Sequence, residues 1–150
     1  MTMAGERVFV DTNVLVYATR PSSGMQRQAS KALQDLEDGG AELCISRQII
    51  REYLATVTRP QAASVPLAPA VAVGDAKRFA EIYTILEDGP AITDALLDVV
   101  ARFATGGRQI HDANIVATML AHGVRRLLTF NTADFARFGG MIDLESLPAA

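Results

Sequence analysis

The sequence predicts a layered α/β fold in which helices cover a mostly parallel central sheet. Short runs that are apolar throughout are typical of strands buried on both faces. Longer stretches carry apolar residues at helical spacing. The two kinds of segment alternate along the 150 residues, which is the order expected of parallel strands joined by helices.

Three short apolar runs predict central strands, at residues 8–10, 43–45 and 126–129. A further run at residues 141–144 is predicted to add an edge strand. The sheet is therefore expected to begin near the N-terminus and to end near the C-terminus.

Five amphipathic stripes predict helices between these strands. Gly39 and Gly40 follow the first stripe as a stop signal, and Ser46 precedes the second as a suitable N-cap. The stripes consist of Ala29, Ala32, Leu33 and Leu36; Ile49, Ile50, Tyr53, Leu54 and Val57; Phe79, Ile82, Tyr83 and Leu86; Leu96, Val99, Val100 and Phe103; and Ile115, Val116, Met119 and Leu120.

Residues 60–74 contain Pro60, Pro66 and Pro69 among small residues and are predicted to form a loop between two helices. The segment is too short and too apolar for a domain linker. Residues 1–150 are therefore expected to form a single domain.

The charge balance does not by itself indicate a nucleic-acid partner. The net charge is -3, whereas nucleic-acid binders are usually basic. Carboxylates that converge on bound cations stop counting as surface repulsion, so this balance does not exclude such a partner. Of the 14 cationic residues, 12 are arginine, whose planar fork suits phosphate contacts, although a GC-rich coding sequence would give the same bias.

Cys44 is the single cysteine, so no disulfide framework is possible within the chain. It lies in a run predicted to be a core strand and has no neighbouring base, so a buried core thiol is expected. Residues 1–7 lack the apolar core of a signal peptide, and no run approaches the length of a membrane span. We therefore expect a soluble, cytoplasmic protein.

Asp11 directly follows the first predicted strand, and Asn13 comes two residues later. In an open parallel sheet, ligands bind at the carboxyl ends of the strands, which favours a functional role for Asp11. The alternative is an N-cap for a helix that begins near Thr12 or Asn13. The sequence favours the two alternatives equally.

Asp112 falls in the middle of the apolar stripe formed by Ile115, Val116 and Met119, in the first turn of its predicted helix. An acid at the centre of an apolar face must be paired or must hold a metal ion, because an unpaired buried charge is costly. Capping remains an alternative, since the helix dipole favours an anion there. A cap does not need to face the core, however, so a ligand role is favoured.

Asp134 and Glu52 give weaker signals. Asp134 follows the predicted strand at residues 126–129, with Asn131 close by, and would be taken alone for a turn residue or a helix cap. Glu52 shares the polar side of its helix with Gln48 and Arg51, and would be taken alone for a solvated glutamate.

Considered together, the four acids offer only hard oxygen ligands, which select Mg²⁺ or Mn²⁺ over zinc or copper. His111 and His122 have no companion at zinc-ligand spacing. Carboxylates around a magnesium ion suit phosphodiester cleavage, because the ion generates a hydroxide nucleophile and neutralises charge on the phosphate.

The acid-bearing segments resemble those of the PIN-domain nucleases, in particular the VapC toxins of prokaryotic toxin–antitoxin pairs. The segments are VFVDTNVL at residues 8–15, SRQIIRE at 46–52, IHDANIVA at 110–117 and LTFNTADF at 128–135. The similarity spans nearly the whole chain, in the family's order and spacing.

The resemblance implies a metal-dependent endoribonuclease with a PIN-like three-layer fold and about five strands. It also implies homodimerisation and inhibition by a small VapB-like antitoxin. Many PIN domains carry an acid where this chain has Asn131, so it stays open whether Asp134 or Asn131 completes the site. The implied catalytic residues and ligands of Mg²⁺ or Mn²⁺ are Asp11, Glu52, Asp112 and Asp134, with polar support from Asn13, Ser46, Thr129 and Asn131.

Other classes of protein fit less well. A haloacid-dehalogenase-type phosphatase needs a second Asp where this chain has Asn13, and a response-regulator receiver needs a lysine that residues 125–131 lack. The remaining alternative is a PIN-like module that binds RNA or a protein without cutting. Four intact carboxylates argue against it, because a scaffold has no reason to gather mutually repelling acids.

Overall fold

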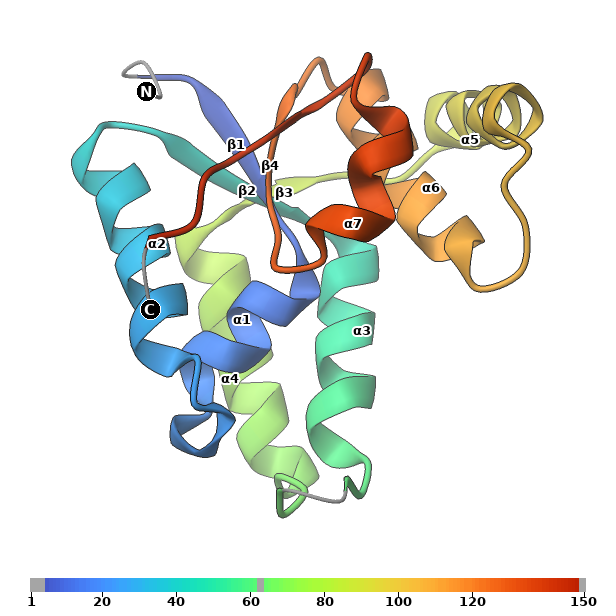
Figure 1. The fold of residues 1–150 in the computed structure, drawn as a ribbon. Coiled ribbons are helices and arrows are strands. Elements are labelled where there is room, and N and C mark those ends of the chain that lie inside the picture. Colours follow the sequence, from blue (N-terminus) through green and yellow to red (C-terminus); the bar gives the residue numbers. More distant parts are fainter. Residues whose placement is uncertain (1–4, 62–63, 149–150) are drawn as a thin grey trace.

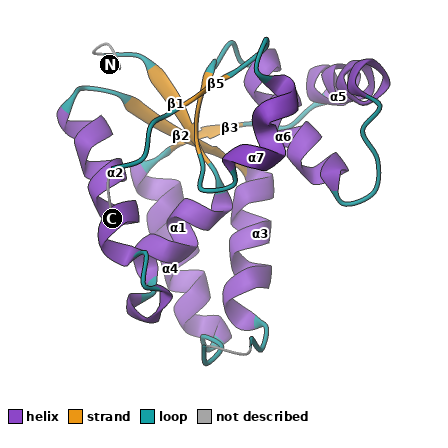
Figure 2. Ribbon diagram, viewed as in Figure 1, coloured by secondary structure: helices purple, strands orange, loops and turns teal. Residues whose placement is uncertain are grey.

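A sheet of five parallel strands forms the middle layer of the protein (Figures 1 and 2). The computed structural model describes residues 5–61 and 64–148. The strands lie in the order β3-β2-β1-β4-β5, so β1 occupies the centre. Their bounds are Arg7–Val10 for β1, Glu42–Ser46 for β2, Thr84–Leu86 for β3, Arg126–Leu128 for β4 and Asp143–Leu144 for β5.

Helices cover both faces of the sheet, with α1 to α4 on one side and α5 to α7 on the other (Figure 1). This division follows from the strand order: the chain steps outward from β1 to β3, then returns past β1 to reach β4, and right-handed crossovers place the helices of the two directions on opposite faces. The helices are α1 (Thr12–Thr19), α2 (Gln26–Asp38), α3 (Arg47–Thr58), α4 (Pro69–Ile82), α5 (Pro90–Phe103), α6 (Gln109–Ala121) and α7 (Thr132–Phe135), with 3₁₀ turns at Pro21–Ser23 and Ala136–Phe138.

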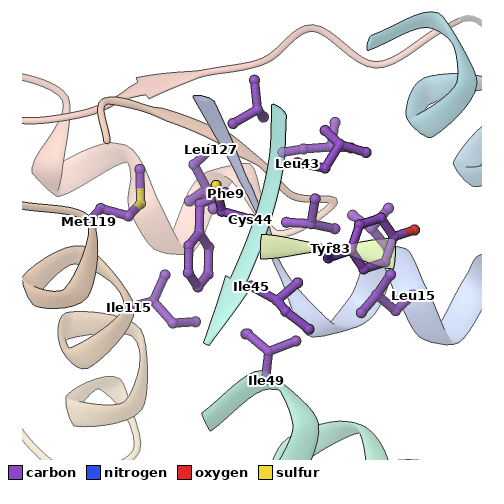
Figure 3. Close-up of a cluster of buried hydrophobic side chains, with 14 of the residues drawn as sticks. Phe9, Leu15, Leu43, Cys44, Ile45, Ile49, Tyr83, Ile115, Met119 and Leu127 are labelled. Carbon is purple, nitrogen blue, oxygen red and sulfur yellow. The ribbon is translucent and has the colours of Figure 1, made fainter. Parts of the chain in front are cut away.

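The core lies on both faces of the central strands (Figure 3). Phe9 of β1 packs on the side where α6 supplies Ile115 and Met119, whereas Leu15 of α1 lies on the opposite side. Cys44 is fully buried in β2, and this burial raises the pKa of its thiol to about 11. The sequence-based predictions of a three-layer fold and of a buried core thiol are therefore confirmed.

The prediction of one helix through Phe79, Ile82, Tyr83 and Leu86 is wrong. Helix α4 ends at Ile82, Tyr83 is extended, and Leu86 belongs to strand β3. Pairing of β3 with β2 supplies backbone partners along that edge and buries Leu86, whereas Ile82 is left 65% exposed. A short strand with two apolar residues matches helical spacing by chance.

The predicted loop at residues 60–74 is too long at its C-terminal end, because α4 already begins at Pro69. Proline is favoured in the first turn of a helix, where its missing N–H leaves no partner unsatisfied. Residues 62 and 63 of this loop lie outside the described residues. The remainder is fastened by the Arg20 side chain, whose nitrogens donate to the carbonyl oxygens of Val57 (3.3 Å) and Val65 (2.6 Å).

The other predicted elements are confirmed, although the edge strand β5 is shorter than expected. Helix α2 ends at Asp38 with Gly39 as its C-cap, and Gly40 adopts a φ of 86°, a left-handed conformation that glycine tolerates. Within residues 5–61 and 64–148, none of the helices combines the length and apolar character that a membrane crossing requires.

Candidate active site

The carboxyl ends of β1 and β4 lie side by side at the topological switch point of the sheet, where the chain leaves neighbouring strands toward opposite faces. The chain leaves β1 into α1 on one face and leaves β4 into α7 on the other, and such switch points are where open α/β sheets bind ligands. A pocket of about 660 Å³ opens there. Its walls include all four of the predicted acids, Asp11, Glu52, Asp112 and Asp134.

Asp11 is buried between the ends of β1 and β4. Its Oδ1 accepts a hydrogen bond from the backbone N–H of Thr12 (2.7 Å), which makes it the N-cap of α1. Its Oδ2 accepts from Thr129 Oγ1 (2.8 Å) and from Asn13 Nδ2 (3.1 Å). Asn13 Oδ1 in turn accepts from the Phe130 N–H (3.0 Å), which ties α1 to the end of β4. The capping alternative and a position in the pocket are therefore both true of Asp11.

Glu52 is half-buried and held at both carboxylate oxygens. Thr12 Oγ1 donates to Oε1 (2.8 Å), and Gln48 Nε2 donates to Oε2 (2.9 Å). The buried Gln48 also donates to the carbonyl oxygen of His111 (2.8 Å) and accepts from Asn114 Nδ2 (2.8 Å), which joins α3 to the first turns of α6. The expectation of a solvated glutamate, which Glu52 alone suggested, is therefore wrong.

Thr12, Gln48 and Asn114 were not singled out by the sequence analysis, although they fix the geometry of the site. Gln48 stands four residues before Glu52, so the two lie one turn apart on the same face of α3. This spacing could have indicated from the sequence that Gln48 contacts Glu52. The buried partner on α6 could not be inferred from one helix alone.

Asp112 lies in the first turn of α6, half-buried at the edge of that helix's apolar face. Asp134 lies in the first turn of the short helix α7 and is exposed to the pocket. The negative charges of the two side chains interact with each other. Asp112 was expected at the centre of an apolar face, whereas the structure leaves it half-buried on the wall of the pocket.

Burial and neighbouring negative charges raise the pKa values of two of the acids, Asp11 and Asp112. Burial, together with the negative charges of Glu52 and Asp112, raises the pKa of Asp11 from 3.8 to about 6, although the hydrogen bonds that Asp11 accepts oppose the rise. Burial, followed by the charges of Asp134 and Glu52, raises the pKa of Asp112 from 3.8 to about 6. Both shifts mean that the folded protein without metal resists ionisation of these carboxyls.

A pH dependence of stability follows from these shifts. A carboxyl whose pKa is raised in the folded state contributes stability below its unfolded pKa and loses that contribution as pH rises through the folded pKa, here from about 4 to above 6. We therefore expect that, in EDTA, the free energy of unfolding of Asp11→Asn rises relative to that of the wild type by about 2 kcal/mol between pH 4 and pH 7.5. Denaturant unfolding across this range measures the difference. A gap between the two proteins that does not change with pH would contradict it.

The predicted polar support residues differ in position. Asn13 and Thr129 contact Asp11 directly, and the Asn131 N–H donates to Thr129 Oγ1 (3.0 Å) while Asn131 itself lines the pocket. Ser46 occupies the N-cap position of α3, as predicted, but makes no capping hydrogen bond. Its buried hydroxyl oxygen has no hydrogen-bond partner among the described residues, so it makes no hydrogen bond to the acids.

The donor set of the pocket fits a hard divalent cation, because its acids offer only oxygen atoms. Among the described residues, however, no group of three or more His, Cys, Asp or Glu side chains converges closely enough to hold one ion. The carboxylates are near enough to raise one another's pKa values without converging on one point.

The fold and the site define an α/β domain with an acidic pocket at the switch point of a parallel sheet. The profile of the PIN domain matches residues 8–141, so this chain belongs to the PIN-domain family. No curated protein sequence matches the chain significantly.

Solved structures from toxin–antitoxin systems share the fold. The structure of VapBC2 from Rickettsia felis, bound to a DNA fragment from its promoter, has a chain 18% identical with a TM-score of 0.70, covering 95% of this chain and 99% of that chain. VapC20 from Mycobacterium tuberculosis, described as a Sarcin-Ricin loop cleaving toxin, is 15% identical with a TM-score of 0.71, covering 94% and 99%. A toxin–antitoxin complex from Klebsiella pneumoniae has a chain 22% identical with a TM-score of 0.60, covering 93% and 96%.

Proposed function

We propose that this protein is a metal-dependent endoribonuclease and the toxin of a VapBC-type toxin–antitoxin pair. One observation carries the proposal: four acids from four separate segments line one pocket, and the pKa values of two of them are raised by burial and by their neighbours' charges. A protein that gathers such acids loses stability unless something positive binds there. The family and the VapC structural neighbours supply the reaction class.

In this proposal Asp11, Glu52, Asp112 and Asp134 hold Mg²⁺ or Mn²⁺. When bound, such an ion activates water and stabilises negative charge on the phosphate and the leaving group. Asp11 and Glu52 are already oriented by hydrogen-bond donors. Oδ2 of Asp11 accepts two hydrogen bonds, whereas Oδ1 of Asp11 and both carboxylate oxygens of Glu52 each accept one and retain a lone pair for a cation. Asp112 and Asp134 accept no hydrogen bond from the described residues in this structure and are free to turn toward an ion.

Hydrogen bonds around Asp11 and Glu52 do the positioning work of the site. Thr129 and Asn13 fix Asp11 against the end of β4, and Gln48 fixes Glu52 against α6. Outer groups of this kind hold ligands in place, and their loss typically costs about 10- to 100-fold in metal affinity or activity.

The partners belong to the same proposal. Several structural neighbours are VapBC complexes, which supports a small VapB-like antitoxin as the inhibitor. We also propose that the active form is a cytoplasmic homodimer. An arginine from the antitoxin would be attracted to the acids much as a cation is, and would form charge-assisted hydrogen bonds with them.

One observation favours a second candidate function, a PIN-like module that binds RNA or a protein without cutting. The acids do not converge on a single point among the described residues. The two candidates differ in whether a divalent cation binds the pocket and whether RNA is cut.

We expect the purified protein to cleave single-stranded RNA in Mg²⁺ or Mn²⁺ and to stop in EDTA, because its proposed ligands are all oxygen atoms. Gel analysis of a labelled RNA, with the metal restored after chelation, is the measurement. Cleavage that persists after chelation, or that follows added zinc instead, would exclude this site as the source of activity.

A further inference from the structure

Two exposed arginines line the pocket together with its four acids. Arg59 and Arg108 both contribute to its walls and are exposed. Most other arginines are engaged: Arg47 pairs with Glu87, and Arg78 pairs with Asp75, for example. Within residues 5–61 and 64–148, the guanidinium groups of Arg59 and Arg108 make no hydrogen bond or ion pair. They are therefore available to a ligand in the pocket.

Arg59 shares one face of α3 with Glu52. The pocket residues Glu52, Ala55, Thr56 and Arg59 stand at i, i+3, i+4 and i+7, which places them along a single side of that helix. Seven residues at the helical rise separate the backbones of Glu52 and Arg59 by about 10 Å. The arginine therefore lies about two turns beyond the acids.

Arg108 enters the pocket from a different direction. It stands directly before α6, one helical turn ahead of Asp112. In Figure 1 the C-terminal end of α3 lies well apart from the start of α6, so the two arginines come from separate walls. Glu52 and Asp112 come from these same two helices, whereas Asp11 and Asp134 follow the ends of β1 and β4, so the pocket that the arginines line is the one that holds the acids.

The two arginines offset the repulsion between the pocket acids and the phosphates of an RNA strand. An RNA strand carries a negative charge at every phosphate, and the pocket acids repel it. A bound cation relieves that repulsion only at the phosphate it contacts, because screening and distance weaken its effect on the next ones. Phosphates on either side therefore need positive groups of their own, and arginine provides a fork that matches two phosphate oxygens.

We propose that Arg59 and Arg108 bind the RNA phosphates on the two sides of the phosphate that is cut, and so hold the strand across the acidic pocket. The inference rests on the proposed nuclease function and names how the same site recognises its substrate. Both arginines act in binding the strand and have no part in activating water.

The direct test is binding of a short fluorescent single-stranded oligouridylate to proteins that carry Asp11→Asn, which prevents cleavage. We expect Arg59→Ala and Arg108→Ala each to raise Kd about five- to tenfold, and to make the slope of log K against log salt shallower by about 0.7, the value for one lost phosphate contact on a single strand. Arg27→Ala is the matched control, because Arg27 is an exposed arginine of α2 outside the pocket. Affinities and slopes equal to those of Arg27→Ala would overturn the proposal.

Cleavage kinetics with Asp11 intact separate this inference from the function on which it rests. We expect Arg59→Ala and Arg108→Ala to raise KM about five- to tenfold and to leave kcat nearly unchanged, with Arg→Lys at either position restoring most of the loss. If the wild type cuts RNA and both alanine variants keep its KM, the proposed role of Arg59 and Arg108 in binding the strand is wrong, whereas the proposed nuclease function is unaffected. If the wild type cuts no RNA, the nuclease proposal fails, whereas the binding measurement still decides whether the two arginines hold a strand.

Discussion

Asp11→Asn and Asp112→Asn are each expected to lower kcat for RNA cleavage by at least about 10²–10³-fold, the typical cost of removing one group that stabilises transition-state charge. Each change removes one negative charge from the pocket with almost no change in shape. Single-turnover cleavage of a labelled RNA measures the loss. Asp98→Asn is the matched control, because Asp98 is an exposed carboxylate of α5 that does not line the pocket.

The same variants separate catalysis from folding. Because the pKa values of Asp11 and Asp112 are raised in the folded protein, their neutral amides should unfold at or above the wild-type temperature in EDTA at neutral pH. Gln48→Ala should have a smaller effect on cleavage. We expect kcat to fall by about 10- to 100-fold, because the change releases Glu52 without removing a carboxylate. If both Asp variants melt far below the wild type in EDTA, the raised pKa values of Asp11 and Asp112 do not weaken the folded state, and the expected effect on stability is wrong.

Expression of the wild-type protein alone is expected to arrest the growth of a bacterial host, whereas expression of Asp11→Asn should leave growth unchanged. An endoribonuclease without its inhibitor acts on RNA continuously, and Asp11 is the acid most deeply buried at the site. Growth curves after induction provide the measurement, with Asp98→Asn expected to arrest growth as the wild type does.

The level of soluble protein must be matched among these strains. Unimpaired growth in the presence of verified soluble wild-type protein would remove the toxin interpretation and leave a milder processing nuclease. Co-expression of an inhibitor that carries an arginine able to enter the acidic pocket should restore growth.

The fold could be predicted from the sequence where burial leaves a simple pattern. The central strands β1, β2 and β4 are apolar on both faces because helices cover both, so they appear as continuous apolar runs. Strand β3 was missed because it has only three residues, and its Leu86 continues the spacing of the helix before it. What makes it a strand is its pairing with β2, which lies 40 residues earlier and leaves no local signal.

The site shows the same limit. Asp112 could be recognised because it interrupts an apolar stripe, and Asp11 because it follows a buried strand. Glu52 could not be recognised as a site residue in this way, because it shares a helix face with the polar Gln48, and that face looks solvent-exposed in the sequence. In the structure, however, Gln48 is buried. A polar residue can occupy a buried face when its partners, here the His111 carbonyl and Asn114, come from another helix. Only the assembled fold reveals that pairing.

Asp11 also shows why a choice between a cap and a ligand cannot be made from sequence. One of its oxygens accepts from the first N–H of α1, and the other faces Thr129 and Asn13 across the switch point. Capping orients the carboxylate, and this orientation holds it at the pocket. The capping role of Asp11 is therefore compatible with its proposed role as a metal ligand.

Calorimetric titration with Mn²⁺ tests most directly the central claim that these acids hold a divalent cation. Compared at pH 7.5 and at about pH 5, the wild type should bind more tightly at the higher pH, because the raised pKa values of Asp11 and Asp112 leave both carboxyls partly protonated below about 6. Asp98→Asn should bind as the wild type does, whereas Asp11→Asn should lose most of the affinity. Equal Mn²⁺ binding by Asp11→Asn and the wild type, or no binding by the wild type at either pH, would contradict the claim.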